Sequence, residues 1–384
     1  MPFHRTTRSR RRLAALMLTP LALLALNAPA TASGTASNPS GQQGGEQEID
    51  WRHPPRDENP TLRNLADRNN LRIGTAVDMN ALANDQVYRD RIAIEFNSVT
   101  AENVMKWGPL EPQRGVLNFG PADELVAFAK ANDQKVRGHT LLWHNQLPGW
   151  LTAGVADGSI GPDELRSILR QHIFDVVRHF RGKIYQWDVV NEVIDDSAQL
   201  RNTIFLQQLG PGYIADAFRW AHEADPTVKL YLNDYNVEGI SAKSDAYYAL
   251  AQQLLAERVP VHGMGIQGHL GVQFGFWPAS TVAANMKRFE ALGLETSVTE
   301  ADVRMIMPAD TVKLQAQAQG YSTLMQGCLL AKRCTSFTVW GYTDKYSWVP
   351  GFFTGQGAAN LLDENFGPKP AYDEMQAVLR LGKE

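Results

Sequence analysis

Strand-like and helix-like stretches alternate eight times along this chain, and that alternation restricts the fold more than any other feature of the sequence. The expected strands are 71–77, 98–103, 135–143, 186–192, 229–233, 263–269, 296–300 and 336–343, and the helices that follow them are 85–96, 121–132, 162–180, 213–223, 242–257, 279–292, 312–330 and 369–381. Eight such units in about 325 residues predict a single α/β domain of the (β/α)8 type, the TIM barrel. An open doubly wound sheet is disfavoured because no glycine-rich loop follows the first strand.

Residues 1–32 have the features of a secretory signal peptide. They contain five arginines and no acids, then an apolar run over 13–26 that is too short to span a bilayer, then small residues at 28–32 where cleavage would occur. We therefore expect a secreted, extracellular protein, exported by either the Sec or the twin-arginine route. Residues 33–57 are rich in Gly, Ser, Gln and Pro, which predicts a disordered leader before a catalytic domain at 58–382.

Charge and cysteine content limit the classes of partner. Loss of the five arginines would shift the formal net charge from −4 to −9, which disfavours nucleic acid as a partner. Cys328 and Cys334 are the two cysteines, and in an exported protein we expect a disulfide rather than free thiols, worth roughly 2 kcal/mol for so short a loop. Their number and spacing do not suit a metal site, so we expect no metal and no cofactor. After signal cleavage we expect a monomer without membrane association.

Two glutamates, Glu192 and Glu300, each stand at the end of an expected strand. The stretch 185–192 is rich in β-branched and aromatic residues, and a period of two places Asp188 and Glu192 on one face. Cleavage of a glycosidic bond needs one carboxylic acid to protonate the leaving oxygen and one carboxylate on the other side of the sugar. We therefore hypothesise that Glu192 and Glu300 form this pair. Asp188, four residues deeper, is expected to be a hydrogen-bonded residue of the barrel core.

Polar and aromatic residues accumulate at seven of the eight expected strand ends, where (β/α)8 barrels carry their chemistry. They are Glu102, Asn103 and Lys106; His139, Trp143, His144 and Gln146; Asn191 and Glu192; Asn233 and Tyr235; Gln267 and His269; Glu300 and Asp302; and Trp340 and Trp348. A single histidine or tryptophan usually belongs to a core, but repetition at seven ends is hard to assign to packing. Aromatic faces stack on sugars while amides and charged groups bind hydroxyls, so the mixture indicates a carbohydrate site. For His144 a structural hydrogen bond and a sugar contact both stay open.

Five stretches together resemble family 10 glycoside hydrolases: TAENVMKW at 100–107, GHTLLWHNQLPGW at 138–150, WDVVNE at 187–192, GIQGH at 265–269 and TVWG at 338–341. The resemblance runs from about residue 62 to about residue 381. It implies a (β/α)8 barrel with retaining endo-β-1,4-xylanase activity on xylan and xylo-oligosaccharides. One position departs from the family pattern, because Ala301 replaces the usual leucine beside Glu300, which reduces a packing contact and leaves both carboxylates intact.

The resemblance also implies a role for each matching residue. Glu192 would be the acid/base and Glu300 the nucleophile, with Asn191 bonded to the sugar 2-hydroxyl and His269 and Asp302 orienting Glu300. The sugar at the cleaved bond would contact His139, Trp143, Gln267 and Trp340. The next sugar on the non-reducing side would contact Glu102, Asn103, Lys106, Gln146 and Trp348, and the leaving group would contact Asn233 and Tyr235.

Two other functions compete with xylan hydrolysis. A β-glucanase on the same barrel is disfavoured because Gln146 and Trp348 would crowd the extra hydroxymethyl group of a hexose. A barrel that binds sugar without catalysis is disfavoured because such proteins typically lose one of the two glutamates, and this chain retains both.

Overall fold

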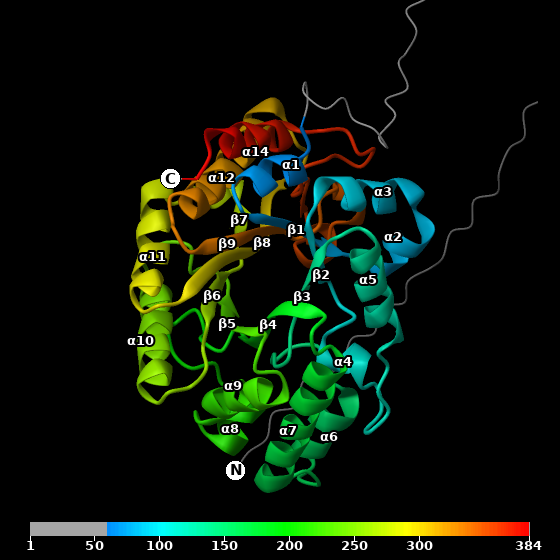
Figure 1. Ribbon diagram of the computed structural model, residues 1–384, viewed down its shortest axis with the longest axis vertical. Helices are drawn as coiled ribbons and strands as arrows, with labels where there is room; N and C mark the ends of the chain where they lie inside the picture. The colour runs from blue at the N-terminus through cyan, green and yellow to red at the C-terminus, as the bar shows by residue number, and fades with distance from the viewer. Residues whose placement is uncertain (1–59, 384) are drawn as a thin grey trace, which may run out of the picture. The chain divides into compact units, whose positions relative to one another are not determined.

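The computed structural model describes residues 60–383, so the predicted signal peptide (1–32) and leader (33–57) lie outside it. Eight parallel strands pair in the order β1, β2, β3, β4, β5, β6, β8 and β9, and β9 pairs back with β1 to close the ring. The helices lie outside this ring of strands (Figure 1). The predicted (β/α)8 barrel is confirmed. Among residues 60–383, no helix has the length and apolar character needed to cross a membrane.

The elements have the following bounds. The strands are β1 (Arg72–Val77), β2 (Ser98–Ala101), β3 (Lys135–Gly138), β4 (Ile184–Asn191), β5 (Lys229–Asp234), β6 (Gly263–Ile266), β7 (His269–Gly271), β8 (Glu295–Ile306), β9 (Cys334–Val339) and β10 (Gln356–Gly357). The α-helices are α1 (Leu62–Arg68), α2 (Met79–Asn84), α3 (Gln86–Glu95), α4 (Trp107–Leu110), α5 (Gly120–Ala131), α6 (Gly149–Ala156), α7 (Pro162–His179), α8 (Ile204–Leu209), α9 (Tyr213–Ala224), α10 (Ala242–Ala256), α11 (Ala279–Ala291), α12 (Thr311–Leu329), α13 (Val349–Phe352) and α14 (Pro370–Leu381), with 3-10 turns η1 (Val272–Phe274) and η2 (Asp344–Tyr346).

Four predicted strands need correction. The strands predicted at 135–143 and 336–343 end earlier, at Gly138 and Val339. The stretch 263–269 is not one strand, because the chain turns at Gly268, where φ is +79°, between β6 and β7. The strand predicted at 296–300 is β8, which runs on to Ile306 because β7 and β10 pair with its outer half. The extension matters for function, since β8 carries polar side chains well beyond Glu300.

Helix α7 illustrates why the outer layer forms where it does. Pro162 occupies the first turn with Asp163 and Glu164, and Arg178 and His179 end the helix, so the end charges complement the helix dipole. Its buried positions (Leu165, Leu169, His172, Ile173, Phe174, Val176 and Val177) follow helical spacing and cover one face. On that face His172 Nε2 lies 3.0 Å from the carbonyl oxygen of Leu141, in the segment that follows β3.

The layer between the strands and the helices is filled by large side chains that need small neighbours. Trp187 belongs to it, because strand alternation points it away from the inward-facing Asp188, and its ring lies 6.1 Å from that of Phe180 at the end of α7. The indole of Trp187 lies against Gly138, where an added Cβ would come within 2.1 Å of the ring. Any larger residue at position 138 would therefore displace the indole. Trp187 is 1% exposed, so this contact is a fully buried part of the core.

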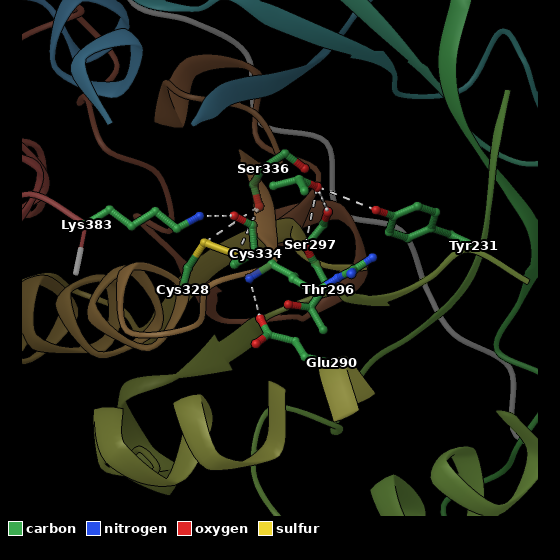
Figure 2. Close-up of a disulfide and its surroundings, with 10 residues drawn as sticks. Tyr231, Glu290, Thr296, Ser297, Cys328, Cys334, Ser336 and Lys383 are labelled. Carbon is green, nitrogen blue, oxygen red and sulfur yellow. Dashed lines mark hydrogen bonds between the residues drawn. A yellow bond between two sulfur atoms is a disulfide. The ribbon is translucent and has the colours of Figure 1, made fainter. Parts of the chain in front are cut away.

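The amino-terminal ends of the strands form the base of the barrel, and the predicted disulfide lies there. Cys328 at the end of α12 is bonded to Cys334 at the start of β9, with a Cα–Cα distance of 5.3 Å. Figure 2 shows the bond beside Lys383, whose ammonium group donates to the Cys334 carbonyl at 2.7 Å. On the same side, the Tyr231 hydroxyl donates to Glu295 at 2.8 Å. The base is thus closed by covalent, ionic and hydrogen bonds.

Candidate active site

A pocket of about 880 Å³ opens at the carboxyl ends of the strands. Every residue predicted for the site lines it except Asn233 and Asp302: Glu102, Asn103, Lys106, His139, Trp143, Gln146, Asn191, Glu192, Tyr235, Gln267, His269, Glu300, Trp340 and Trp348. Residues from β2 through β9 and the loops that follow them therefore meet in one place. Glu192 and Glu300 face the same pocket.

Glu192 follows β4 in a backbone conformation that a residue with a side chain rarely adopts. Its φ is +59°, in the left-handed region, which costs about 1–3 kcal/mol for a residue other than glycine. Backbone bonds hold it there, since its N–H donates to the Asn233 carbonyl at 2.9 Å and its carbonyl accepts from Arg201 Nε at 2.7 Å. The turn directs the carboxylate out of the strand and into the pocket.

Three side-chain amides connect the two glutamates. Gln267 Nε2 donates to Glu192 Oε1 at 3.2 Å and to Asn191 Oδ1 at 3.2 Å. Asn233 Nδ2 donates to the same Asn191 oxygen at 2.8 Å and to Glu300 Oε1 at 2.7 Å. The relative position of the two carboxylates is therefore fixed by a continuous hydrogen-bond network.

Glu300 is also held from the side opposite Asn233. His269 Nε2 lies 3.2 Å from Glu300 Oε2, and His269 Nδ1 lies 2.9 Å from Asp302 Oδ2. Asp302 in turn accepts from Trp348 Nε1 at 2.8 Å. A histidine with a carboxylate at each ring nitrogen donates to both only when it is protonated.

The pKa shifts of Glu300 and His269 agree with a protonated histidine between two carboxylates. Burial alone would raise the pKa of Glu300, but the electrostatic influence of His139 and the hydrogen bond and charge of His269 lower it to about 2. Burial would lower the pKa of His269, but Asp302 and Glu300 raise it to about 10. At neutral pH Glu300 is therefore an anion and His269 a cation.

His139, Asp188 and Glu300 come close enough to be considered as metal ligands, with one ligand atom from each within 4.8 Å of the others. Asp188 Oδ2 is already shared by the guanidinium of Arg137 and by His139 Nδ1, the latter at 2.8 Å. A divalent ion would meet the charge of Arg137, so these residues do not suit one. Asp188 is fully buried and bonded, in agreement with its predicted role in the core.

One wall of the pocket carries linked polar groups from the ends of β2 and β3. Asn103 Oδ1 accepts from Lys106 Nζ at 3.1 Å and from Gln146 Nε2 at 3.3 Å, and the ammonium group lies 4.9 Å from the Trp143 ring centre. Burial, together with the charge of Asp78, raises the pKa of Glu102 to about 7. This wall presents donors and acceptors beside an aromatic face, which suits sugar hydroxyls and C–H groups.

On the other side of Glu192, Tyr235 is fixed by cations. Its hydroxyl accepts from Arg201 at 3.0 Å, and Lys243 Nζ lies 3.4 Å from its ring centre. Lys243 forms ion pairs with Asp234 at 2.9 Å and Asp196 at 3.4 Å. The ring is therefore held rigidly at the edge of the pocket.

Asn233 and Asp302 lie below the pocket surface, both 0% exposed. Asn233 supports Glu300 there, and its contact with a leaving-group sugar stays a prediction. His144 lines the pocket, with Nδ1 4.0 Å from Glu192 Oε2. Ala301 is buried, and its carbonyl accepts from the Trp340 backbone N–H at 2.9 Å, so the residue beside Glu300 positions Trp340 through its main chain.

Several residues of the pocket wall were not predicted: Asn145, Arg201, Asn236, Arg304, Gly351, Phe352 and Phe353. Arg201 lies in an irregular segment nine residues after Glu192, where no sequence pattern marks it. Arg304 had a usable signal, because it continues the alternation of Glu300 and Asp302 along one strand face. The predicted strand 296–300 stops before Arg304, so the alternation did not lead to it.

Comparisons with known proteins agree with this geometry. The family model described as "Glycosyl hydrolase family 10" matches residues 61–378. An endo-1,4-beta-xylanase from Agaricus bisporus is 44% identical over 302 residues, which are 78% of this chain and 88% of that protein. Endo-1,4-beta-xylanase B from Thermotoga neapolitana is 42% identical, over 83% of this chain and 91% of that protein. The crystal structure of xylanase 10B from Thermotoga petrophila RKU-1 in complex with xylobiose matches with a TM-score of 0.80 and 41% identity, over 84% of this chain and 98% of that one.

Proposed function

This chain belongs to glycosyl hydrolase family 10, and we propose that it is an endo-1,4-β-xylanase that cleaves within xylan chains with retention of anomeric configuration. The observation that carries the proposal is the pair Glu192 and Glu300, which face one pocket and are joined through three amides. Its relatives of similar length are named as xylanases. A signal peptide at 1–32 would deliver the enzyme to extracellular polysaccharide, where its substrate is found.

In the first step Glu300 is the nucleophile. Its carboxylate is ionised, with a pKa near 2, and is aimed by His269 and Asn233. An oxygen of Glu300 attacks the anomeric carbon, the glycosidic C–O bond breaks, and Glu192 transfers its proton to the departing oxygen. Direct attack requires the two carboxyl groups to be about 5–5.5 Å apart.

In the second step Glu192 acts as a base. It takes a proton from water, the water oxygen attacks the anomeric carbon, and the ester bond to Glu300 breaks. Each step inverts the anomeric carbon, so the product keeps the configuration of the substrate. Asn191 would hold the sugar 2-hydroxyl throughout, since its amide lies between Glu192 and Asn233.

The walls of the pocket would bind the sugars on either side of the cleaved bond. His139, Trp143, Gln267 and Trp340 surround the reacting sugar. The group of Glu102, Asn103, Lys106, Gln146 and Trp348 takes the next sugar toward the non-reducing end, and Tyr235 takes the leaving group. The bulk of Gln146 and Trp348 favours a pentose over a hexose.

The purified enzyme tests the proposal on linear xylan, soluble cellulose and xylohexaose. We expect release of internal fragments from xylan, slower attack on cellulose, and the β-anomer as the first product observed by proton NMR. First appearance of the α-anomer would show an inverting reaction and remove Glu300 as nucleophile. Faster hydrolysis of cellulose than of xylan would replace the proposed substrate with a glucan.

A further inference from the structure

Arg304 lies in the pocket wall, and the acidic residue whose charge acts on it, Asp302, is already bonded to His269 and Trp348. Arg304 is on β8, four residues after Glu300, and strand alternation places the two side chains on the same face. A rise of ~3.3 Å per residue separates their Cα atoms by ~13 Å along the strand, toward the rim of the pocket. The side chain is half-buried, and within residues 60–383 it forms no ion pair.

The guanidinium of Arg304 is held in place, yet part of its donor capacity is unused. One terminal nitrogen donates to the carbonyls of His269 and Leu270, at 3.5 and 3.2 Å. Nε is buried without a hydrogen-bond partner in the described part of the chain, and both hydrogen bonds of the guanidinium there come from the first terminal nitrogen, which leaves the second for a ligand. A guanidinium offers five N–H groups, so a ligand can still be bound without breaking the two existing bonds.

Arg201 and Lys106 also line the pocket, but both are less free than Arg304 to bind an anionic ligand. Arg201 donates to the carbonyls of Glu192 and Ile194 and to the hydroxyl of Tyr235, so its Nε and one terminal nitrogen are engaged. Lys106 lies in the field of all three glutamates of the pocket. Arg304 is therefore the pocket cation best placed to receive a negative charge from a ligand.

Aromatic rings surround Arg304 at the rim. Its guanidinium carbon lies 4.0 Å from the Phe353 ring centre and 5.8 Å from that of Phe274. Phe274 is 74% exposed, and Phe352, whose ring lies 4.8 Å from that of Phe353, is 70% exposed, which is unusual for large apolar side chains on a free surface. A cation flanked by exposed rings can pair with a carboxylate while the rings stack on sugar C–H faces.

We propose that Arg304 binds the carboxylate of a uronic acid branch on the xylan chain, an inference that rests on the proposed function. The cations at the cleavage centre are already engaged, because His269 is bonded to Glu300 and Asp302 and Lys106 lies in the field of the pocket glutamates. Arg304 gives the branch a position at the rim, where its negative charge is paired while the neutral main chain occupies the centre. The enzyme would then prefer xylan that carries acidic branches over the same chain with the charge removed.

The test uses a xylo-oligosaccharide with one glucuronic acid branch and its methyl ester, which has the same sugars without the charge. In the unaltered enzyme we expect kcat/KM to be about tenfold higher for the acid, as one charge-assisted hydrogen-bonded pair provides. Arg304→Gln should bring this ratio close to one, and Arg304→Lys should keep part of it. In the unaltered enzyme the ratio should also fall as salt is added, because the contact is at the rim.

The matched control is Arg178→Gln. Arg178 lies on the outer helix α7 with its guanidinium 4.4 Å from the Phe174 ring centre, so it repeats the arginine–phenyl contact away from the pocket. The acid-to-ester ratio of kcat/KM in Arg178→Gln should equal that of the unaltered enzyme.

Two results would overturn the proposal: equal kcat/KM for the acid and the ester in the unaltered enzyme, or an unchanged ratio in Arg304→Gln. If Arg304→Gln does not fold, the unaltered enzyme tests the proposal by itself. An acid-to-ester ratio of kcat/KM that does not change with salt would then overturn the proposal. Hydrolysis of unbranched xylohexaose reports separately on the proposed function.

Discussion

The mouth and the base of the barrel satisfy their polar groups in different ways. At the base, Glu295 takes the Tyr231 hydroxyl at 2.8 Å on one oxygen and the Lys229 ammonium at 3.0 Å on the other. At the mouth, Gln146, Glu192 and Asn236 all have φ between +50° and +59° and all line the pocket. The base therefore holds an ion pair on regular strands, while the mouth places three polar side chains, among them Glu192, on strained backbone.

The difference separates residues that stabilise the barrel from residues that act on a ligand. Glu295 has a partner on each oxygen and lies at the base, where it does not line the pocket. Glu300 also has a partner on each oxygen, but it lines the pocket, where a ligand can reach it. Glu300 is bonded only to groups that keep it ionised and aimed, and Arg304 keeps unused donors. We expect substitutions at the mouth to change activity more than stability, and substitutions at the base to do the reverse.

The sharpest test makes the same substitution at two places on β8, one at the mouth and one at the base. Glu300→Gln removes the proposed nucleophile, and we expect kcat on xylan to fall by about 10⁴-fold or more, because a neutral amide cannot attack the anomeric carbon. Glu295→Gln at the first residue of the strand should keep kcat within about twofold and lower the free energy of unfolding by about 1 kcal/mol. Kinetics and urea unfolding measure both. An active Glu300→Gln enzyme would end the assignment of the nucleophile.

Replacement of the proposed acid should have a smaller effect that depends on the substrate. Glu192→Gln should lower kcat/KM on xylan by about 10²–10³-fold, since the leaving oxygen then departs without a proton. An aryl xylobioside whose phenol is a good leaving group needs no such proton, so its bond cleavage should be much less affected. Pre-steady-state release of the phenol checks this. Equal losses on both substrates would contradict a role for Glu192 as the acid.

The charge pair at the mouth predicts how stability depends on pH. The pKa of His269 is raised from 6.5 to about 10 in the folded protein, so its stabilising effect is complete below pH 6.5 and is lost as pH rises through 10. The difference in free energy of unfolding between the unaltered enzyme and His269→Gln should therefore shrink between pH 6 and pH 10. Urea unfolding at those two pH values measures it. An equal difference in free energy of unfolding at pH 6 and at pH 10 would show that His269 is not held as a cation.

The disulfide at the base predicts a loss of stability without a loss of activity. Cys328 and Cys334 are six positions apart, and in the chain-entropy model a loop of this length contributes roughly 2 kcal/mol. The double substitution Cys328→Ser/Cys334→Ser should lower the free energy of unfolding by about that amount. Xylan hydrolysis below the unfolding transition should not change. A large fall in kcat would show that the base and the mouth are coupled.

The base and the inner strands could be predicted from sequence more completely than the rim. Strand alternation placed Glu192 and Glu300 on strand ends because period two and β-branched composition are local signals. Arg304 continues the local alternation of Glu300 and Asp302, but the pairing with β7 and β10 that extends β8 to Ile306 leaves no mark in a short window, so the predicted strand stopped before it. The left-handed turn at Glu192 is likewise set by Asn233 and Arg201, which local sequence does not relate to it.

The smallest expected effect concerns one hydroxyl at the base. Tyr231→Phe removes the bond to Glu295 and keeps the ring, which lies over Gly263, where an added Cβ would come within 2.3 Å of it. Since Glu295 keeps its ion pair with Lys229, we expect a loss of only about 1 kcal/mol in the free energy of unfolding and no change in kcat. In a double-mutant cycle with Glu295→Ala, the two losses should sum to more than the loss in the double variant, because both remove the same bond. Strictly additive losses would mean that this hydrogen bond does not stabilise the base, and that the ion pair with Lys229 alone distinguishes it from the mouth.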